Sequence, residues 1–459
     1  MSAPVPYPDP APVSDHAARR LLARLAHAQS SGRLPSVVAG VVRDGEPVWF
    51  GFRGTPEVAG HDPLDVQYRV GSITKTMTAV LVLQLVRDGR VSLDDPASAV
   101  LGDLGGNAYA HRTIRTLLAH SSGMQSEPAG SWWERSAGLS FEELVAANDG
   151  TGAAFGAGER FHYSNLGYAL LGELAARLLG TSWWEAVQER VLVPLGMTRT
   201  SYLPEGAAAQ GRSVHPYDGT LVDEPATDTG AMAPAGQVWA TITDLATYAT
   251  FLGHGHPEVL SVEELDRAYA PASGSPEDGV RSVHGLGFQV FAGGSGTLAG
   301  HTGSMPGFVA TVLVDRKRRT GGVVLANATT GYSPAALVME LLDELESSEP
   351  TLAATWVPSA GVPAALAGVP GVWHWGNTPF VFAVEGTELV ARRGGVEAYR
   401  FRVTGDGRVV GHSGYHAGEE LHVVRRPDGT IGHLEVATFV YTRTPYDPAA
   451  PIPGGVPGA

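Results

Sequence analysis

Strand-like segments stand at both ends of the first 346 residues, and helix-like segments separate them. Apolar runs with strand character occupy residues 36–42, 47–51, 287–291, 308–314 and 322–326. Residues 110–250 carry mainly helical patterns, and a last helix is predicted at 334–346. Strands at the two ends of a domain with helices inserted between them predict an α+β fold built on one mostly antiparallel sheet.

The character of the sequence changes near Ser347. Residues 347–370 are rich in Pro, Ala and Gly, which is typical of a linker. Short apolar runs then alternate with turns at residues 380–384, 388–391, 399–403, 422–424 and 434–441. Even spacing of this kind is typical of a small antiparallel β-barrel, of a lipocalin-like type. We therefore predict a first domain over residues 1–346, a linker over 347–370, a barrel over 371–447 and a disordered tail over 448–459.

The composition excludes several classes of function. The net charge is −15, and a polyanion is a poor nucleic-acid binder because phosphate contacts need clustered Lys and Arg. The chain has no cysteine, which rules out disulfides, thiolate zinc sites and a cysteine nucleophile. No H-E-x-x-H pattern supports a metal site either. We expect neither a metal nor a cofactor.

The N-terminal residues do not have the pattern of an export signal. Residues 1–12 are rich in Pro and lack an apolar core region. The most apolar stretch, residues 77–86, has about half of the ~20 residues that a membrane span needs. We therefore expect a cytoplasmic protein that does not associate with membranes.

The segment Gly71-Ser72-Ile73-Thr74-Lys75 begins a helical pattern that runs to Val86. Residues three apart on a helix share a face, so Ser72 and Lys75 are expected to lie side by side. A serine hydroxyl needs a base to take its proton, and a lysine can be that base only when it is neutral. The chain has just two lysines, Lys75 and Lys317. A chance S-x-x-K on a surface helix is the alternative, and for this tetrapeptide alone the two interpretations are about equal.

Two further segments carry polar groups that could complete a site. Tyr163 and Asn165 stand two residues apart just before a helical pattern and can direct their polar groups into one cleft. Residues 300–307 read Gly-His-Thr-Gly-Ser-Met-Pro-Gly and resemble the edge of a strand. Small residues there would let a substrate backbone approach closely.

Together these segments resemble the motifs of the serine β-lactamase and penicillin-binding-protein superfamily, in its class C-like branch. That branch carries S-x-x-K, Y-x-N and K/H/W-x-G in this order, which stand here at Ser72–Lys75, Tyr163–Asn165 and His301–Gly303. Further stretches that resemble the family lie at residues 68–71, 113–124, 193–197 and 234–241. The resemblance covers about residues 15–345 and implies a β-lactamase-like domain.

The resemblance implies a role for each motif residue. Ser72 would attack a carbonyl and become acylated, while Lys75 and Tyr163 together would act as general base and then as general acid. Asn165 would orient the substrate amide. His301 would position Tyr163 or the substrate.

Further residues are candidates for binding the substrate. The resemblance implies an oxyanion hole made by the backbone N–H groups of Ser72 and Ser304, in a segment that includes Thr302 and Gly303. Trp132 and Trp133 lie in a loop between the first two motifs. Contact with substrate and packing in the cleft wall are equally good interpretations of these tryptophans.

Histidine at position 301 differs from the residue that is usual in the family, and this difference bears most on function. Members of the family that trim peptidoglycan or destroy β-lactams usually carry Lys there, as a fixed cation for a substrate carboxylate. A histidine is mostly neutral at pH 7 unless its surroundings raise its pKa. His301 therefore disfavours carboxypeptidase and β-lactamase activity, and it suits members that act on esters, amides, D-aminoacyl groups or thioesters.

Within the superfamily, the chain looks most like the penicillin-binding-protein-type thioesterases, which pair one catalytic domain with one barrel and carry H-x-G. That resemblance implies release and macrocyclisation of nonribosomal peptides, with a carrier-protein-bound peptidyl thioester as partner. A D-aminopeptidase, D-amino-acid amidase or carboxylesterase of the same branch, acting on a small peptide or ester, is the alternative. A catalytically silent binding protein is disfavoured because all three motifs are intact.

Overall fold

In the computed structural model, the chain forms two compact units, Met1–Thr351 and Leu352–Ala459. The structure describes residues 12–55, 58, 60–104, 106–275, 282–293, 296–329, 331–352, 355–358 and 361–446. The division between the units falls within the Pro-, Ala- and Gly-rich residues 347–370. The tail predicted at 448–459 lies outside the described residues.

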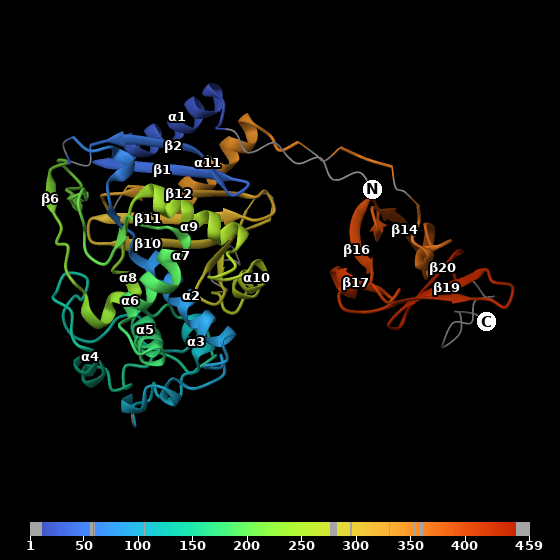
Figure 1. Cartoon of the computed structure of the whole chain (residues 1–459), viewed down its shortest axis with the longest axis horizontal. Helices are drawn as coiled ribbons and strands as arrows, with labels where there is room; N and C mark the ends of the chain where they lie inside the picture. The colour runs from blue at the N-terminus through green and yellow to red at the C-terminus, as the bar shows by residue number, and fades with distance from the viewer. Residues whose placement is uncertain are drawn as a thin grey trace. The chain divides into compact units, whose positions relative to one another are not determined.

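A seven-stranded antiparallel sheet is the frame of the first unit (Figure 1). Its strand order is β2-β1-β12-β11-β10-β9-β8, so strands from the two ends of the unit lie side by side. The strands are β1 (Ser36–Arg43), β2 (Glu46–Gly54), β8 (Ser282–His284), β9 (Gln289–Ala292), β10 (Thr297–Met305), β11 (Phe308–Asp315) and β12 (Thr320–Ala326). The pairing of β1 with β12 confirms the predicted α+β fold with an antiparallel sheet.

Helices cover both faces of this sheet. α1 (Asp15–Ser31) and α11 (Pro334–Ser348) pack together on one face, and α9 (Ile242–His254) packs on the other (Figure 1). Alternate residues of a strand point to opposite faces. On β1, Val37 belongs to the core under α1 and α11, whereas Val38 belongs to the core on the other side. Burial on both faces explains why residues 36–42 form a continuous apolar run.

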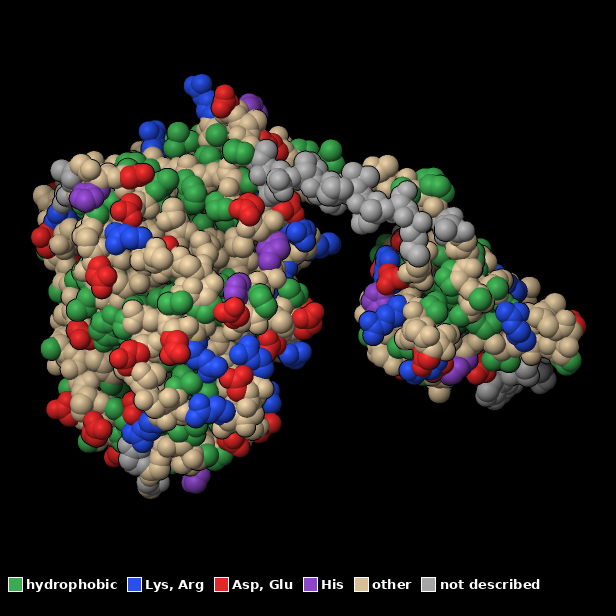
Figure 2. Space-filling model, in the orientation of Figure 1, with side chains coloured by type: hydrophobic (Ala, Val, Ile, Leu, Met, Phe, Trp, Pro, Cys, Tyr) green, Lys and Arg blue, Asp and Glu red, His purple; other side chains and the backbone are tan. Residues whose placement is uncertain are grey.

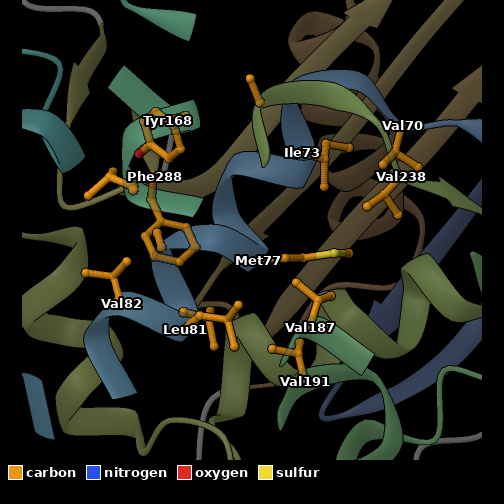
Figure 3. Packing of buried hydrophobic residues seen from close by; sticks show 14 of the residues in the cluster. Val70, Ile73, Met77, Leu81, Val82, Tyr168, Val187, Val191, Val238 and Phe288 are labelled. Carbon is orange, nitrogen blue, oxygen red and sulfur yellow. The ribbon is translucent and has the colours of Figure 1, made fainter. Parts of the chain in front are cut away.

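α2 (Thr74–Arg87) packs against three of the remaining helices of the first unit, α5 (Asn165–Leu179), α6 (Trp183–Val187) and α8 (Ala233–Gly236). The others are α3 (Ile114–Leu118), α4 (Phe141–Ala147), α7 (Val193–Leu195) and α10 (Val262–Tyr269). Met77, Leu81 and Val82 of α2 lie in one core with Val187 and Phe288 (Figure 3). A helix that is apolar on all sides belongs in a core. The buried helix gives the segment at its N-terminal end a rigid support.

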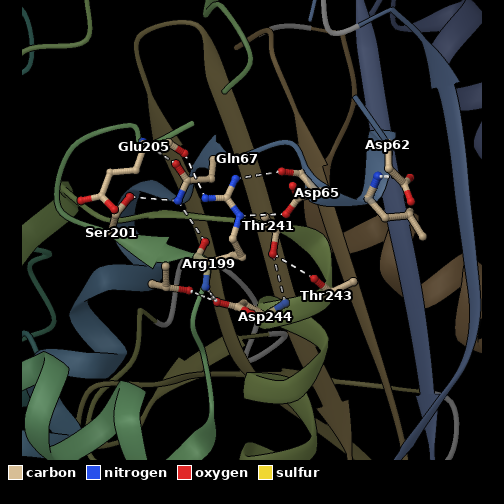
Figure 4. A network of polar contacts seen from close by, with 11 residues as sticks. Asp62, Asp65, Gln67, Arg199, Ser201, Glu205, Thr241, Thr243 and Asp244 are labelled. Carbon is tan, nitrogen blue, oxygen red and sulfur yellow. Dashed lines mark hydrogen bonds and ion pairs between the residues drawn. The ribbon is translucent and has the colours of Figure 1, made fainter. Parts of the chain in front are cut away.

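A polar network holds the chain just before Gly71. Gln67 Nε2 donates to the carbonyl of Arg199 at 3.0 Å and to Ser201 Oγ at 2.9 Å (Figure 4). Asp244 on α9 accepts the backbone N–H of Arg199 at 2.8 Å. The network braces a small sheet of β3 (Tyr68–Arg69), β7 (Trp239–Ala240) and β4 (Thr200–Ser201); a separate hairpin consists of β5 (Arg212–Val214) and β6 (Leu221–Asp223).

The second unit is an eight-stranded antiparallel sheet that is nearly closed into a barrel, as predicted. The strand order is β17-β16-β15-β14-β13-β20-β19-β18, and a bridge between Val410 and Glu420 joins its two edges. The strands are β13 (Gly371–Trp375), β14 (Thr378–Glu385), β15 (Glu388–Arg393), β16 (Val396–Val403), β17 (Val409–Ser413), β18 (Leu421–Arg425), β19 (Ile431–Val436) and β20 (Phe439–Thr442). Trp373 and Tyr441 are completely buried in its core.

The single strand predicted at 434–441 is wrong. The segment contains a hairpin, in which Val436 at the end of β19 pairs with Phe439 at the start of β20. Ala437, within the turn, has a φ of +50°. Two-residue hairpin turns usually carry Gly, Asn or Asp at such positions. The Ala-Thr turn lacks that signal, so the sequence reads as one strand.

The surface of the first unit is mixed in charge. Figure 2 shows acidic and basic side chains interspersed over its visible face. Among the residues that the structure describes, no helix is both long enough and apolar enough to cross a membrane.

Candidate active site

Ser72 lies in a turn of 3₁₀ helix, Gly71–Ile73, directly before α2. Gly71 has a φ of +54°, a conformation that glycine adopts without strain. A Cβ at this position would lie 2.6 Å from the backbone nitrogen of Ser304. Gly71 therefore turns the chain into the helix and also lets β10 approach the Ser72 turn.

Lys75 lies one turn further along and faces Ser72, as the spacing predicts. Its Nζ donates to Ser72 Oγ at 3.0 Å and to the carbonyl oxygen of Ala235 at 2.6 Å. The side chain is completely buried, and this burial lowers the pKa of Lys75 to about 7, although the carboxylates of Glu127 and Glu134 raise it. A substantial fraction of Lys75 is thus neutral near pH 7, as a general base requires.

Tyr163 completes a polar group around the serine. The side chains of Tyr163 and Ser72 are hydrogen-bonded, and Lys75 Nζ lies 5.1 Å from the centre of the Tyr163 ring. Burial raises the pKa of Tyr163, so its phenol is protonated at neutral pH. Of the two side chains, Lys75 is therefore the one that can accept a proton near neutral pH. Tyr163 lies beside Ser72, where it can relay a proton between Lys75 and a substrate.

His301 on β10 joins this group as a neutral side chain. Its ring centre lies 6.2 Å from that of Tyr163. Its Nδ1 is hydrogen-bonded to the carbonyl oxygen of Thr302. Burial lowers the pKa of His301 well below its usual value, and nearby Lys75 lowers it further. The site therefore has no fixed cation at position 301.

The other residues of the third motif place β10 against Ser72. A Cβ on Gly303 would lie 1.9 Å from the carbonyl oxygen of Val70 and 3.1 Å from the backbone nitrogen of Ser72. β9 pairs with β10 only as far as Gly300, so the strand edge beyond Gly300 is open. The Thr302 N–H reaches across this edge to Gln289 Oε1 at 2.9 Å.

The backbone N–H of Ser304 is directed to the edge of β10 on which Thr302 donates to Gln289. Alternate residues of a strand direct their N–H groups to one side, so the N–H of Ser304 follows that of Thr302. It lies beside Gly71 and Ser72. Two backbone N–H groups that converge next to a serine hydroxyl can bind the oxygen of a substrate carbonyl.

Asn165, the first residue of α5, makes a contact that the sequence does not predict. Its Nδ2 donates to Glu127 Oε1 at 2.7 Å, and Trp133 Nε1 donates to Glu127 Oε2, also at 2.7 Å. Asn165 of the second motif and Trp133 of the preceding loop thus donate to the same carboxylate. Trp133 lies near the turn that carries the serine, because a Cβ on Gly236 would lie 3.5 Å from the Trp133 ring and 3.8 Å from the backbone of Gly71.

The neighbouring Trp132 lies further out, with 58% of its surface exposed. Its Nε1 donates to Glu134 Oε2 at 2.8 Å, and burial raises the pKa of Glu134. Sequence reasoning missed Glu127 and Glu134. The only signal was the position of both carboxylates beside the paired tryptophans, in a loop between two motifs.

A bound metal ion would need several His, Asp or Glu side chains close together. Over the described ranges, no three His, Asp or Glu side chains gather closely enough to hold an ion.

The fold and the site define a class of protein. An antiparallel sheet flanked by helices, with a serine and a lysine three residues apart at the start of a buried helix, is the arrangement of the serine β-lactamase and penicillin-binding-protein superfamily. The chain belongs to the Beta-lactamase family, whose model matches residues 18–346. Residues 362–443 match a domain of unknown function, DUF7586. The resemblance inferred from the three motifs is thereby confirmed at the level of the superfamily.

Curated relatives match over part of their length. Beta-lactamase-like protein 2 of Dictyostelium discoideum is 30% identical over 275 residues, which are 56% of this chain and 49% of that protein. Protein flp of Staphylococcus aureus (strain COL) is 24% identical, over 67% of this chain and 62% of that protein. The chain therefore spans about half to three fifths of these relatives.

A solved structure shows the same fold over nearly the whole chain. The octameric penicillin-binding protein homologue from Pyrococcus abyssi has a TM-score of 0.65 and 23% identity, covering 94% of this chain and 100% of that chain. A D-stereospecific amidohydrolase from Streptomyces sp. has a TM-score of 0.59 and 27% identity, covering 71% and 98%.

Proposed function

We propose that the chain is a serine acyl-enzyme hydrolase in which Ser72 is the nucleophile. The observation that carries this proposal is the buried Lys75, whose Nζ lies 3.0 Å from Ser72 Oγ. Its pKa of about 7 suits a base that works near neutral pH, since it is often unprotonated yet still attracts the serine proton.

In the proposed acylation, Lys75 accepts the hydroxyl proton while Ser72 Oγ bonds to the substrate carbonyl carbon. The backbone N–H groups of Ser72 and Ser304 stabilise the negative charge on the carbonyl oxygen. Lys75 then returns the proton, through the phenol of Tyr163, to the leaving amine, alcohol or thiol as its bond to carbon breaks. Water or an amine attacks the acyl group on Ser72, and the proton transfers run in reverse.

Replacing Gly303 with Ala is expected to lower kcat/KM for p-nitrophenyl acetate by about 10²-fold, the loss typical for one oxyanion donor. The added Cβ would lie 1.9 Å from the Val70 carbonyl oxygen, so β10 must move away from Ser72. Gly253→Ala is the matched control, because nothing lies within 4 Å of a Cβ there. Equal activity of the two variants would show that β10 does not contribute to catalysis.

Two carboxylates favour a substrate whose acyl part carries a free amine. Glu127 and Glu134 both raise the pKa of Lys75, so both act electrostatically on the reacting groups. Arg69 acts on Glu134, but neutral His301 adds no positive charge beside Glu127. A substrate ammonium would be attracted to this side of the site and a carboxylate repelled. These charges, and the likeness to an enzyme named as a D-stereospecific amidohydrolase, support a D-amino-acid amidase or D-aminopeptidase as the finer proposal.

Macrocyclisation of a peptide delivered as a carrier-bound thioester is the second candidate. The same two carboxylates could hold the terminal amine of the peptide beside the acyl group on Ser72. An intramolecular attack of this kind can have an effective molarity on the order of 10⁵ M when the ends are well placed. Attack by that amine would then compete with hydrolysis.

Mass spectrometry of the products separates these candidates. The panel contains D-alanyl p-nitroanilide, its N-acetyl form, simple esters, and linear peptidyl thioesters that end in D- or L-residues. Hydrolysis of the anilide with a free amine supports the amidase, and a cyclic product supports the cyclase. Only hydrolysed acid from every thioester counts against cyclisation, and turnover of no substrate overturns the proposed function.

Replacing Glu127 with Gln is expected to raise KM for D-alanyl p-nitroanilide about tenfold, because a hydrogen bond to a charged group is lost. The KM of the N-acetyl form, which has no ammonium, should change little. Glu142→Gln, at an exposed carboxylate in the first turn of α4, is the control. Equal effects on both anilides would remove Glu127 from recognition of the amine.

A further inference from the structure

His120 contacts the first two residues of the second motif and the residue just before them. Its carbonyl oxygen accepts the N–H of His162 at 2.7 Å. Its ring stacks on that of Tyr163, with centres 4.0 Å apart and planes 22° apart. Its Nδ1 accepts the N–H of Ser164 at 3.0 Å. One residue thus holds both the backbone around Tyr163 and one face of its ring.

These contacts come with two features that destabilise the fold. His120 has a φ of +53°, in the left-handed region, which strains a residue other than glycine although histidine, like Asn and Asp, enters it more often than most. Since Nδ1 accepts a hydrogen bond, the proton of the neutral ring is on Nε2, and Nε2 is buried with no hydrogen-bond partner in the described part of the chain. Strain and an unpaired donor retained at one residue indicate a functional constraint.

The ring is 1% exposed, and charged or titratable neighbours surround it. Burial lowers the pKa of His120 well below its usual value, and Lys75, His284, His301 and His162 lower it further. The ring is therefore neutral across the working range of Lys75, and its Nδ1 remains an acceptor. It makes no hydrogen bond to Ser72 or Lys75 among those that the structure describes, so it acts through Tyr163.

We propose that His120 is a positioning residue, which holds the Tyr163 phenol against Ser72 and Lys75 by stacking on its ring and binding the backbone next to it. The inference rests on the proposed function, because it assigns His120 a role only through the proton transfer by Tyr163. A small displacement of a transferring group, on the order of 1 Å, can lower a rate about 10²-fold.

Two variants separate the two contacts. His120→Phe keeps an aromatic ring but has no Nδ1 acceptor, whereas His120→Asn tolerates the backbone conformation and keeps an acceptor without the stack. For a simple alkyl ester, whose leaving alkoxide must take up a proton, both are expected to lower kcat by about 10²-fold with little change in KM. The pH dependence of kcat/KM should also shift, because the environment of Lys75 changes. His111→Asn, at an exposed histidine, is the control.

A double-mutant cycle with Tyr163→Phe tests whether His120 acts through the phenol. If it does, His120→Phe has no further effect in the Tyr163→Phe background. If the double variant loses activity by the product of the two single losses, the inference is overturned and the proposed function stays intact. Full activity of both folded His120 variants has the same consequence. An unimpaired Tyr163→Phe enzyme instead refutes the proton-transfer role and the inference with it. Melting temperatures show whether a variant has lost activity because it no longer folds. If one His120 variant does not fold, the double-mutant cycle is measured with the other.

Discussion

Ser72→Ala is expected to lower turnover of p-nitrophenyl acetate by about 10³-fold or more, to the level left by binding and the backbone N–H groups alone. The hydroxyl is the only atom of residue 72 that can form the acyl bond. In native protein quenched with acid during turnover, the intact mass should increase by one acetyl group. The variant should show no increase.

The fold should survive this change, because Ser72 is partly exposed and the Ala side chain fits the same turn. Ser98→Ala, which removes a serine hydroxyl from a different 3₁₀ turn, is the matched control and should keep full activity. Undiminished turnover by Ser72→Ala would end the proposal that this serine is the nucleophile.

Lys75→Arg is expected to lower kcat/KM by about 10³-fold, within the range for loss of a general base. Arginine keeps the positive charge but does not release its proton in a protein. In the proposed mechanism the reactive form of this residue is neutral Lys75, whose pKa is about 7. The value of kcat/KM should therefore rise with pH through about 7 and level off above about pH 8.

The same pKa has a consequence for stability. The usual pKa of lysine is 10.5, so between pH 7 and 10.5 the unfolded chain binds this proton and the folded protein does not. The contribution of Lys75 to the free energy of unfolding should consequently grow as pH rises through this interval.

The chain provides a close control in Lys317→Arg, since these are its two lysines and Lys317 is exposed in the β11–β12 turn. This variant should retain the native rate and pH profile. A flat profile between pH 6 and 9, or activity in Lys75→Arg, would show that Lys75 is not the base.

Much of the fold could be predicted because it depends on local patterns. The apolar runs at 36–42 and 308–314 are strands β1 and β11, and the run from Ile73 to Val86 is essentially α2. The β19–β20 hairpin was missed because its turn at Ala437 lacks the residues that usually accept a positive φ.

Some residues of the candidate site could likewise be predicted from the sequence, and others could not. Ser72, Lys75, Tyr163 and His301 could be named from motif order, and the structure brings all four together. Glu127 and His120 could not, because their contacts with Asn165 and Tyr163 join segments that are 38 and 43 residues apart. No periodic pattern records such a contact.

By itself, the sequence determined the candidate reactive groups and their local geometry, because a spacing of three residues on a helix puts a hydroxyl beside an amine. Only the tertiary structure decided their protonation states. The pKa values of Lys75 and His301 are lowered because the folded protein removes water from around them, and charging a group without water costs free energy. The same packing decided which carboxylates lie near Lys75, and the proposed preference for a substrate with a free amine rests on them.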